Sequence, residues 1–224
     1  MTNKQPPANP RIDNRKEKWE ETARVKAIEA IACVANEEEF KASGLTDAGN
    51  LIRELRTLYE GFSFLSKHIT EHGSGIGRMT HYLYPFFKNG YTCLDVSGTM
   101  LEKNPCPVEK LEMDVSKIPM ENQSTDLIFS FTVLMHNIKS DVKNVFKEFH
   151  RILQKGGHVI FQLPVYRYGV QGETYSSVTI WTLQEVVNLA REAGFEILKL
   201  QQCDREMKNV ISDQHFKYHI FKKK

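Results

Sequence analysis

The sequence predicts an α/β fold in which a doubly wound, mostly parallel sheet of seven strands lies between two layers of helices. From about residue 62 onward, short apolar runs of strand length alternate with amphipathic helical stretches, which favours parallel strands joined by helices. A glycine-rich segment, Glu71 to Arg78, separates the first strand-like run from a helical run. The last two strand-like runs have no helix between them, so the final strand should be antiparallel.

Three parts of the chain differ in composition. Residues 1–14 are rich in proline, asparagine and charge and are expected to form a disordered tail. Residues 15–61 carry two helical patterns, from Lys16 to about Val34 and from Thr46 to Glu60, and are expected to form an N-terminal helical extension. Residues 62–224 are expected to form the core domain.

The strands of the core are placed by apolar runs, and its helices by periodicity and end signals. The expected strands are Phe64–Thr70, Tyr91–Asp95, Leu111–Val115, Asp126–Phe131, Val159–Leu163, Glu196–Leu200 and Tyr218–Lys222. Helices are expected over Met79–Lys88, over Ser97–Lys103, and from a cap at Ser140 to Gln154. A capping box, Thr182 to Glu185, begins the last helix, and Gly194 ends it.

The spacing of the glycines narrows the ligands that the glycine-rich segment serves. A glycine turn between strand and helix lets backbone approach a ligand, and the helix N-terminus offers free N–H groups. The dinucleotide fingerprint requires a sixth-position glycine where this chain has Arg78. The pattern present is acid-x-Gly-x-Gly-x-Gly, from Glu71 to Gly77. By itself this pattern leaves a generic nucleotide-binding turn open.

Acids end the next two strand-like runs. Asp95 follows Gly73 by 22 residues, close to the distance at which an acid reaches ribose hydroxyls in wound α/β folds. Asp114 ends the third run. With the glycine turn and Gly156-Gly157, this order resembles the core of class I S-adenosylmethionine-dependent methyltransferases, from about Phe64 to the C-terminus. The resemblance implies methyltransferase activity, S-adenosylmethionine as the cofactor and a Rossmann-like sheet of seven strands.

The resemblance also assigns contacts to the cofactor. Gly73 and Gly75 would leave room for its methionine end, while Glu71 would either hold the turn or reach the ammonium group through water. Asp95 would accept hydrogen bonds from the ribose hydroxyls, the alternative being a helix N-cap. The other expected cofactor contacts are Val96, Met100 on the adenine face (or in the core), Asp114 and Val115 on the adenine edge, and Phe131.

The acceptor should lie beyond the fourth strand. Residues 131–137 resemble the family segment that passes under the sulfonium, and His136 there is the candidate general base because its ordinary pKa lies near neutrality. A base is needed only if the nucleophile must lose a proton, so a merely pocket-lining His136 is the alternative. Trp19, Tyr166 and Tyr168 are the substrate-binding candidates; the alternative for the two tyrosines is that they are ordinary loop residues. The helical extension that carries Trp19 is expected to close over the site as a lid.

Composition excludes several other classes of protein. A formal net charge of +2 gives no reason to expect nucleic acid as a partner. No apolar run approaches the ~18 residues of a membrane span, and the first residues lack the apolar stretch of a signal peptide. The four cysteines show no CxxC spacing, and no metal-ligand cluster is visible. We therefore expect a cytoplasmic enzyme with reduced thiols, no bound metal and a small-molecule acceptor; the oligomeric state is not specified.

Further features bear on the acceptor and on alternatives. Trp19–Arg24 and Glu37–Gly44 resemble the leader of small bacterial methyltransferases of the type-11 and type-12 kind, often linked to glycan or secondary metabolism. The run from Lys67 to His72 is polar for a central strand, which favours a catalytically silent binding partner as one alternative. Gly75–Arg78 also resembles protein N-terminal amine methyltransferases, the second alternative.

Overall fold

The sheet predicted from the sequence is present in the computed structural model, which describes residues 15–25, 27–28, 36–87, 89–115, 117–166, 174–175, 178–202 and 217–224. Seven strands lie in the order β10-β11-β5-β4-β1-β2-β3. Their bounds are Ile69–His72 (β1), Tyr91–Asp95 (β2), Glu109–Glu112 (β3), Thr125–Ser130 (β4), Leu153–Leu163 (β5), Phe195–Lys199 (β10) and Lys217–Lys223 (β11). Strands β1 to β5 pair in parallel, and β11 is antiparallel to both β5 and β10. The predicted fold class is confirmed; the predicted tail of residues 1–14 lies outside the described residues.

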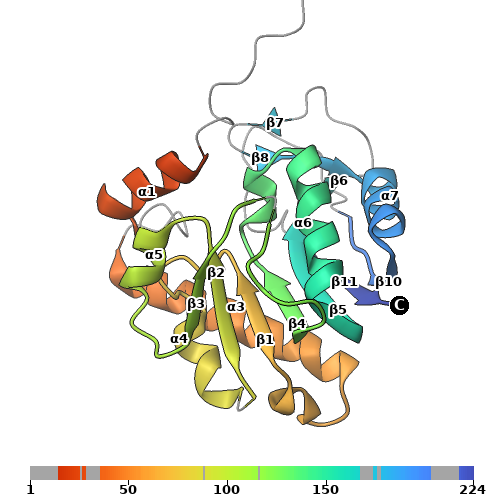
Figure 1. Ribbon diagram of the computed structural model, residues 1–224, viewed down its shortest axis with the longest axis horizontal. Coiled ribbons are helices and arrows are strands. Elements are labelled where there is room, and N and C mark those ends of the chain that lie inside the picture. The colour runs from red at the N-terminus through yellow and green to blue at the C-terminus, as the bar shows by residue number, and fades with distance from the viewer. Residues whose placement is uncertain are drawn as a thin grey trace, which may run out of the picture.

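Helices cover both faces of the sheet (Figure 1). The helices are α1 (Arg15–Val25), α3 (Glu37–Leu58), α4 (Thr80–Leu83), α5 (Gly98–Lys103), α6 (Lys139–Ile152) and α7 (Leu183–Ala193), with short 3₁₀ turns η1 (Ser63–Ser66), η2 (Tyr84–Phe86) and η3 (Leu134–His136). Two short ribbons, β6 (Val165–Tyr166) with β9 (Trp181–Thr182) and β7 (Thr174–Tyr175) with β8 (Val178–Thr179), complete the fold. Among the described helices, none is both long and apolar enough to cross a bilayer.

The alternation of side chains along the central strands divides the core in two. On β5, Val159 and Phe161 pack toward α6 and α7, whereas Ile160 between them packs toward α3. Phe146 and Phe149 of α6 are fully buried against the first face. This two-sided burial is why β4 and β5 are nearly continuous apolar runs in the sequence.

Several predicted boundaries need correction. The first strand was predicted at Phe64–Thr70, but residues Ser63–Ser66 form η1 and the strand is Ile69–His72. The helix predicted over Met79–Lys88 is interrupted after Leu83, because Pro85 has no N–H to bond to the preceding turn. Ser140 does not cap α6; Ile138 holds that position without a side-chain hydrogen bond. The capping box of Thr182 with Glu185 and the left-handed stop at Gly194 are confirmed.

Strand β1 carries polar side chains through the centre of the sheet, and each of them has a partner. The Thr70 hydroxyl donates to the Thr125 hydroxyl at 2.9 Å, and His72 Nδ1 lies 2.9 Å from the Ser130 hydroxyl. Glu71 accepts from the hydroxyls of Thr80 at 2.7 Å and Tyr91 at 2.6 Å. Because these bonds satisfy groups that would otherwise be costly to bury, the polar run is compatible with a central strand.

Helix α3 packs directly against the sheet. Its Leu51 and Leu55 are fully buried in the core on that face. Asp47 Oδ2 lies 2.7 Å from the guanidinium of Arg78, which follows the glycine turn. A Cβ atom at Gly44 would lie 2.2 Å from the Arg78 carbonyl oxygen, so only glycine permits this approach. Of the predicted extension, α3 therefore belongs to the packed layers, and its position is coupled to that of the glycine turn.

Replacing Gly44 by alanine should lower the free energy of unfolding by ~1–3 kcal/mol, because the new methyl group overlaps backbone that cannot yield as a side chain would. Gly49→Ala in the same helix is the matched control. A Cβ there meets nothing within 4 Å, so the higher helix propensity of alanine should raise stability by about 0.5–1 kcal/mol. Urea unfolding measures both, and equal effects of the two substitutions would contradict the close approach.

Glu71 should make stability depend on pH. Complete burial raises its pKa to about 7 from an ordinary 4.5. The protonated form is therefore favoured in the fold, so its contribution is full below pH 4.5 and is lost as pH rises through 7. Between about pH 5 and pH 8 the wild-type chain should lose up to ~3 kcal/mol of stability relative to Glu71→Gln. Urea unfolding at both pH values measures this, and parallel pH dependences would refute it.

Candidate active site

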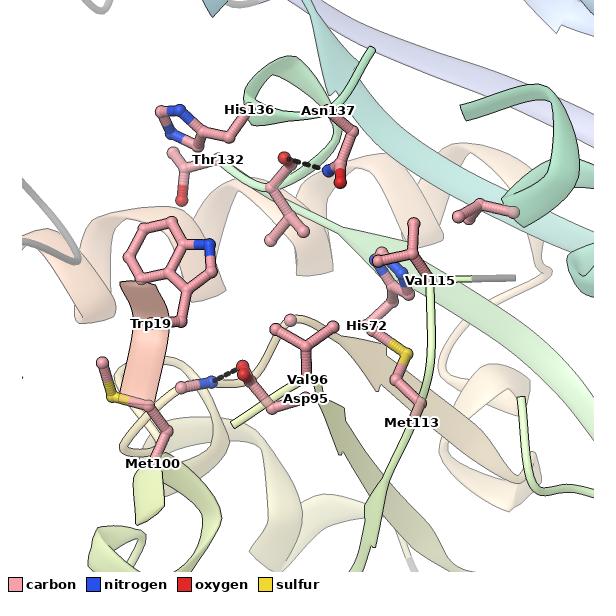
Figure 2. Close-up of a pocket in the computed structure, with 14 residues that line it drawn as sticks. Trp19, His72, Asp95, Val96, Met100, Met113, Val115, Thr132, His136 and Asn137 are labelled. Carbon is pink, nitrogen blue, oxygen red and sulfur yellow. Dashed lines mark hydrogen bonds between the residues drawn. The ribbon is translucent and has the colours of Figure 1, made fainter. Parts of the chain in front are cut away.

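A cleft with about 740 Å³ of empty space, part of it open to solvent, lies at the carboxyl ends of β1, β2 and β4. This is the edge where open α/β sheets bind ligands. Figure 2 shows Trp19 from α1 and the loop after β4 facing the residues that follow β2 across the cleft. The described residues that line it are Trp19, His72, Gly73, Gly75, Asp95, Val96, Met100, Met113, Val115, Thr132, Val133, His136, Asn137 and Val145.

The glycine turn forms one wall of the cleft. Gly73, Gly75 and Gly77 all have positive φ angles, of 74°, 55° and 87°. A Cβ at Gly73 would lie 2.2 Å from Val133 Cγ2, in the loop after β4. Glycine is thus required at this position both by the backbone conformation and by the close approach of the opposite wall.

Asp95 fastens the glycine turn to the end of β2. One carboxylate oxygen accepts the Gly75 N–H at 2.8 Å and the other accepts the Ser97 N–H at 3.0 Å. Burial raises the pKa of Asp95, while these backbone donors oppose the rise. Ser97, not Asp95, is the N-cap of α5, because its hydroxyl accepts the Met100 N–H at 3.1 Å.

Glu71 lies behind the turn and does not line the cleft. Both of its hydrogen-bond donors come from neighbouring elements of the core, Thr80 and Tyr91. With Arg78, Phe131 and other residues it lines a second, smaller cavity of about 280 Å³ on the far side of the turn. Of the two roles expected for Glu71, holding the turn is the one that these contacts support directly.

The side of the cleft after β2 is apolar. Val96, Met100, Met113 and Val115 line it. Asp114 lines a neighbouring recess instead, together with residues that include Lys16 and Glu112. The reason is that β3 ends at Glu112 and the chain then folds back, with the Asp114 N–H donating to the Lys117 carbonyl at 3.2 Å.

The opposite wall is the loop after β4. His136 projects over the cleft and meets Trp19 edge-on, with ring centroids 6.0 Å apart and ring planes at 69°. Thr132 lies beside these two rings (Figure 2), and Val133 lines the cleft next to Gly73. The loop itself is tied together by Asn137, whose side-chain amide donates to the Val133 carbonyl at 3.0 Å.

His72 forms part of the inner wall. Its ring packs edge-on against Phe149 of α6, with centroids 5.0 Å apart. Burial lowers the pKa of His72 to about 3, so the imidazole is neutral at physiological pH. A neutral histidine at this position adds a polar atom to an otherwise apolar wall without adding charge.

The structure brings most of the predicted site residues together. Trp19, Gly73, Gly75, Asp95, Val96, Met100, Val115 and His136 all line the cleft. Glu71 and Phe131 lie on the second cavity, Asp114 on the neighbouring recess, and Tyr166 is buried in β6 away from the lining. Tyr168 lies outside the described residues.

Sequence reasoning missed six residues of the lining: His72, Met113, Thr132, Val133, Asn137 and Val145. Three of them belong to the segment of residues 131–137 already singled out, and naming only Phe131 and His136 there was too narrow. Met113 was missed because the third strand was placed too far along the chain. The only sequence signal for His72 was that it is polar within a central strand. Val145 had no signal that distinguished it from the other buried residues of α6.

Comparisons with known proteins match this architecture. A family model described as a methyltransferase domain matches residues 70–161. The matched segment runs from β1 to β5 and so contains the glycine turn, Asp95 and the loop after β4. A search of curated proteins gives no significant match.

Solved structures share the fold at low sequence identity. An S-adenosylmethionine-dependent methyltransferase from Clostridium acetobutylicum is 15% identical with a TM-score of 0.61, over 92% of this chain and 99% of that chain. Phosphoethanolamine N-methyltransferase 1 of Haemonchus contortus, in complex with phosphoethanolamine and S-adenosylhomocysteine, is 19% identical with a TM-score of 0.55, over 75% of this chain and 35% of that chain. The [4+2]-cyclase SpnF is 19% identical with a TM-score of 0.51, over 60% of this chain, which spans only 52% of that chain.

The family match and the sheet order agree with each other and with the pattern of the sequence. They confirm the predicted family and, with it, S-adenosylmethionine as the cofactor. Residues 70–161 carry a methyltransferase domain, and the chain has the fold of class I S-adenosylmethionine-dependent methyltransferases.

Proposed function

We propose that this chain transfers the methyl group of S-adenosylmethionine to an uncharged small molecule held between the loop after β4 and Trp19. The observation that carries the proposal is the cleft itself, in which the glycine turn and Asp95 face His136 and Trp19. When bound, the cofactor supplies an electrophilic methyl group on a sulfonium. The chain must then position the acceptor in line with that group, which accounts for much of the rate in such displacements.

The two ends of the cleft suit different parts of the cofactor. Each Asp95 oxygen accepts one backbone N–H and keeps a further lone pair, so the carboxylate can still accept from a ribose diol. The apolar side chains of Val96, Met100 and Val115 suit the adenine faces. Gly73 and Gly75 leave backbone exposed for the methionine end.

The charge of the lining supports an uncharged acceptor. Among the described lining residues, Asp95 supplies the single carboxylate, and no lysine or arginine is present. Asp95 is assigned to the ribose, so an acceptor in the remaining space would meet the indole of Trp19, the imidazole of His136 and the amide of Asn137. The leader sequence supports a glycan or secondary-metabolite acceptor, and one neighbour with this fold, phosphoethanolamine N-methyltransferase 1, is in complex with phosphoethanolamine, a small molecule.

Helix α1 has the contacts expected of a lid. Its Glu20 accepts from the hydroxyl of Thr99 in α5, and the N–H of Thr99 lies 3.4 Å from the same carboxylate. Lys16 pairs with Glu112 at the edge of the sheet. These polar contacts hold α1 to α5 and β3 and place Trp19 over the cleft, so we propose that release of these bonds opens the site.

The structure gives little support to the two alternative functions, a catalytically silent binding partner and a protein N-terminal amine methyltransferase. The silent binding partner was favoured by the polar first strand, but the side chains of that strand are satisfied and the cleft has room for a ligand. A protein N-terminal amine as acceptor was suggested by Gly75–Arg78, yet Arg78 is buried and paired with Asp47. The [4+2]-cyclase neighbour shows that the fold alone does not fix the reaction, so methyl transfer needs direct measurement.

The cofactor site can be tested by calorimetry with S-adenosylhomocysteine and with NAD. We expect binding of the first and none of the second. Asp95→Ala should weaken S-adenosylhomocysteine binding by ~1–3 kcal/mol, the cost of removing a charged hydrogen-bond acceptor. Glu102→Ala, an exposed acid on α5, is the control and should leave affinity unchanged. Undiminished affinity in Asp95→Ala would exclude its ribose role.

The role of His136 can be tested once labelled methyl transfer has identified an acceptor. If the attacking group of the acceptor is a hydroxyl, His136→Ala should lower kcat by about 10²–10⁴ and remove the limb of the pH–rate profile near the histidine pKa. Affinity for S-adenosylhomocysteine should hardly change, because the ring lies on the acceptor side. A variant that loses cofactor affinity and keeps the pH profile would assign His136 to the pocket wall, with catalysis by orientation alone.

A further inference from the structure

The loop that carries His136 starts from a strained residue. Thr132 has φ of 59°, in the left-handed region that a β-branched side chain rarely adopts. It is the second residue after the end of β4 and lines both the cleft and the second cavity. Such a conformation persists only where the surroundings enforce it, and residues of this kind cluster at functional sites.

The enforcing contact comes from the neighbouring strand. Gln162 of β5 is 4% exposed, and its side-chain oxygen accepts the Thr132 N–H at 3.0 Å. The Thr132 hydroxyl donates to the Phe131 carbonyl at 2.6 Å, which further fixes the local backbone. Turning Thr132 toward a relaxed conformation would take its N–H away from Gln162.

Gln162 is in turn held by a series of polar contacts. Its amide interacts with the hydroxyl of Tyr218, which also receives the Asn50 side-chain N–H at 2.9 Å. The Tyr218 hydroxyl lies 3.4 Å from Asp47, the partner of Arg78 after the glycine turn. The same set of side chains, on α3, β5 and β11, therefore contacts both walls of the cleft and helps to hold them in place.

The conformation of Thr132 decides where the rest of the loop lies. His136 N–H donates to the Val133 carbonyl at 3.0 Å, as does the Asn137 side chain, so residues 133–137 form one compact turn. Rotation at Thr132 would swing this turn as a body. It would move Val133 away from Gly73 and His136 away from Trp19.

We infer that Gln162 is a positioning residue of this enzyme: by holding Thr132 in its strained conformation, it sets the position of His136 opposite the glycine turn. The inference rests on the proposed function for its catalytic meaning. Its structural content, that one buried amide fixes the loop, stands apart from any acceptor.

Histidine NMR of the full-length chain tests the inference directly, first without ligand and then with S-adenosylhomocysteine. The signal of the His136 ring is identified because it is lost in His136→Gln. Its chemical shift depends on the position of the ring relative to the neighbouring indole of Trp19. Gln162→Met removes the accepting oxygen with little change of shape. Gln162→Glu keeps an oxygen that can accept the Thr132 N–H. Thr132→Gly removes the strain, since glycine adopts positive φ freely.

We expect Gln162→Met to shift the His136 signal and Gln162→Glu to restore it toward the wild-type position. In the Thr132→Gly background, Gln162→Met should have a much smaller effect. Against an identified acceptor, Gln162→Met should lower kcat by up to about 10²-fold, the effect of a ~1 Å misplacement, and change S-adenosylhomocysteine affinity less than twofold.

Two results would overturn the inference: an unmoved His136 signal in Gln162→Met, or an equal shift in the Thr132→Gly background. If Gln162→Met does not fold, Gln162→Ala, which also removes the accepting oxygen, is compared in the two Thr132 backgrounds, and a shift that Thr132→Gly leaves undiminished contradicts the role of strain. A wild-type chain that binds no S-adenosylhomocysteine would refute the proposed function instead, and the ligand-free spectra would still decide the role of Gln162.

Discussion

The carboxylate of Asp95 is the interaction on which the cleft depends. It joins three elements, because it ends β2, accepts the N–H of Gly75 in the glycine turn and accepts that of Ser97 at the start of α5. Without these bonds, the N–H groups of Gly75 and Ser97 would lose their partners, at a cost of about 1–3 kcal/mol each. A loop of glycines has no side chains with which to fix itself. Its shape has to come from a neighbour, and Asp95 is that neighbour.

The polar character of β1 follows from the same need. A central parallel strand is normally apolar, yet Glu71 and His72 lie buried in the middle of this sheet. Glu71 binds Thr80 on the element that follows the turn, and Tyr91 on β2, so it ties both ends of the turn from behind. The glycine turn is thus held on one side by Asp95 and on the other by Glu71. The polar strand belongs to the support of the site.

The fold could be predicted from the sequence because periodicity, glycine stops and one capping box all indicate the same alternation of elements. The residues on the expected cofactor side could be predicted for a similar reason, because acids at the carboxyl ends of parallel strands lie at one edge of the sheet. The exact residues at which strands end were harder to predict. Placing the third strand a few residues late exchanged Asp114 for Met113 in the predicted lining. The support from Gln162 and Asp47 could not be predicted, since it joins strands and helices far apart in the chain.

The two walls of the cleft are built by different physical means, and under the proposed function one holds the cofactor and the other holds the acceptor. The cofactor wall consists of backbone fixed by buried carboxylates, an arrangement that tolerates little change. The acceptor wall consists of one strained residue, Thr132, held by a side-chain amide, and of Trp19 on a helix held by surface polar contacts. Substitutions at Thr132 or in α1 can therefore reshape the acceptor side while the glycine turn keeps its form. We infer that acceptor specificity in this chain is set by the loop after β4 and by α1, whereas cofactor binding is set by the glycine turn and its buried acids.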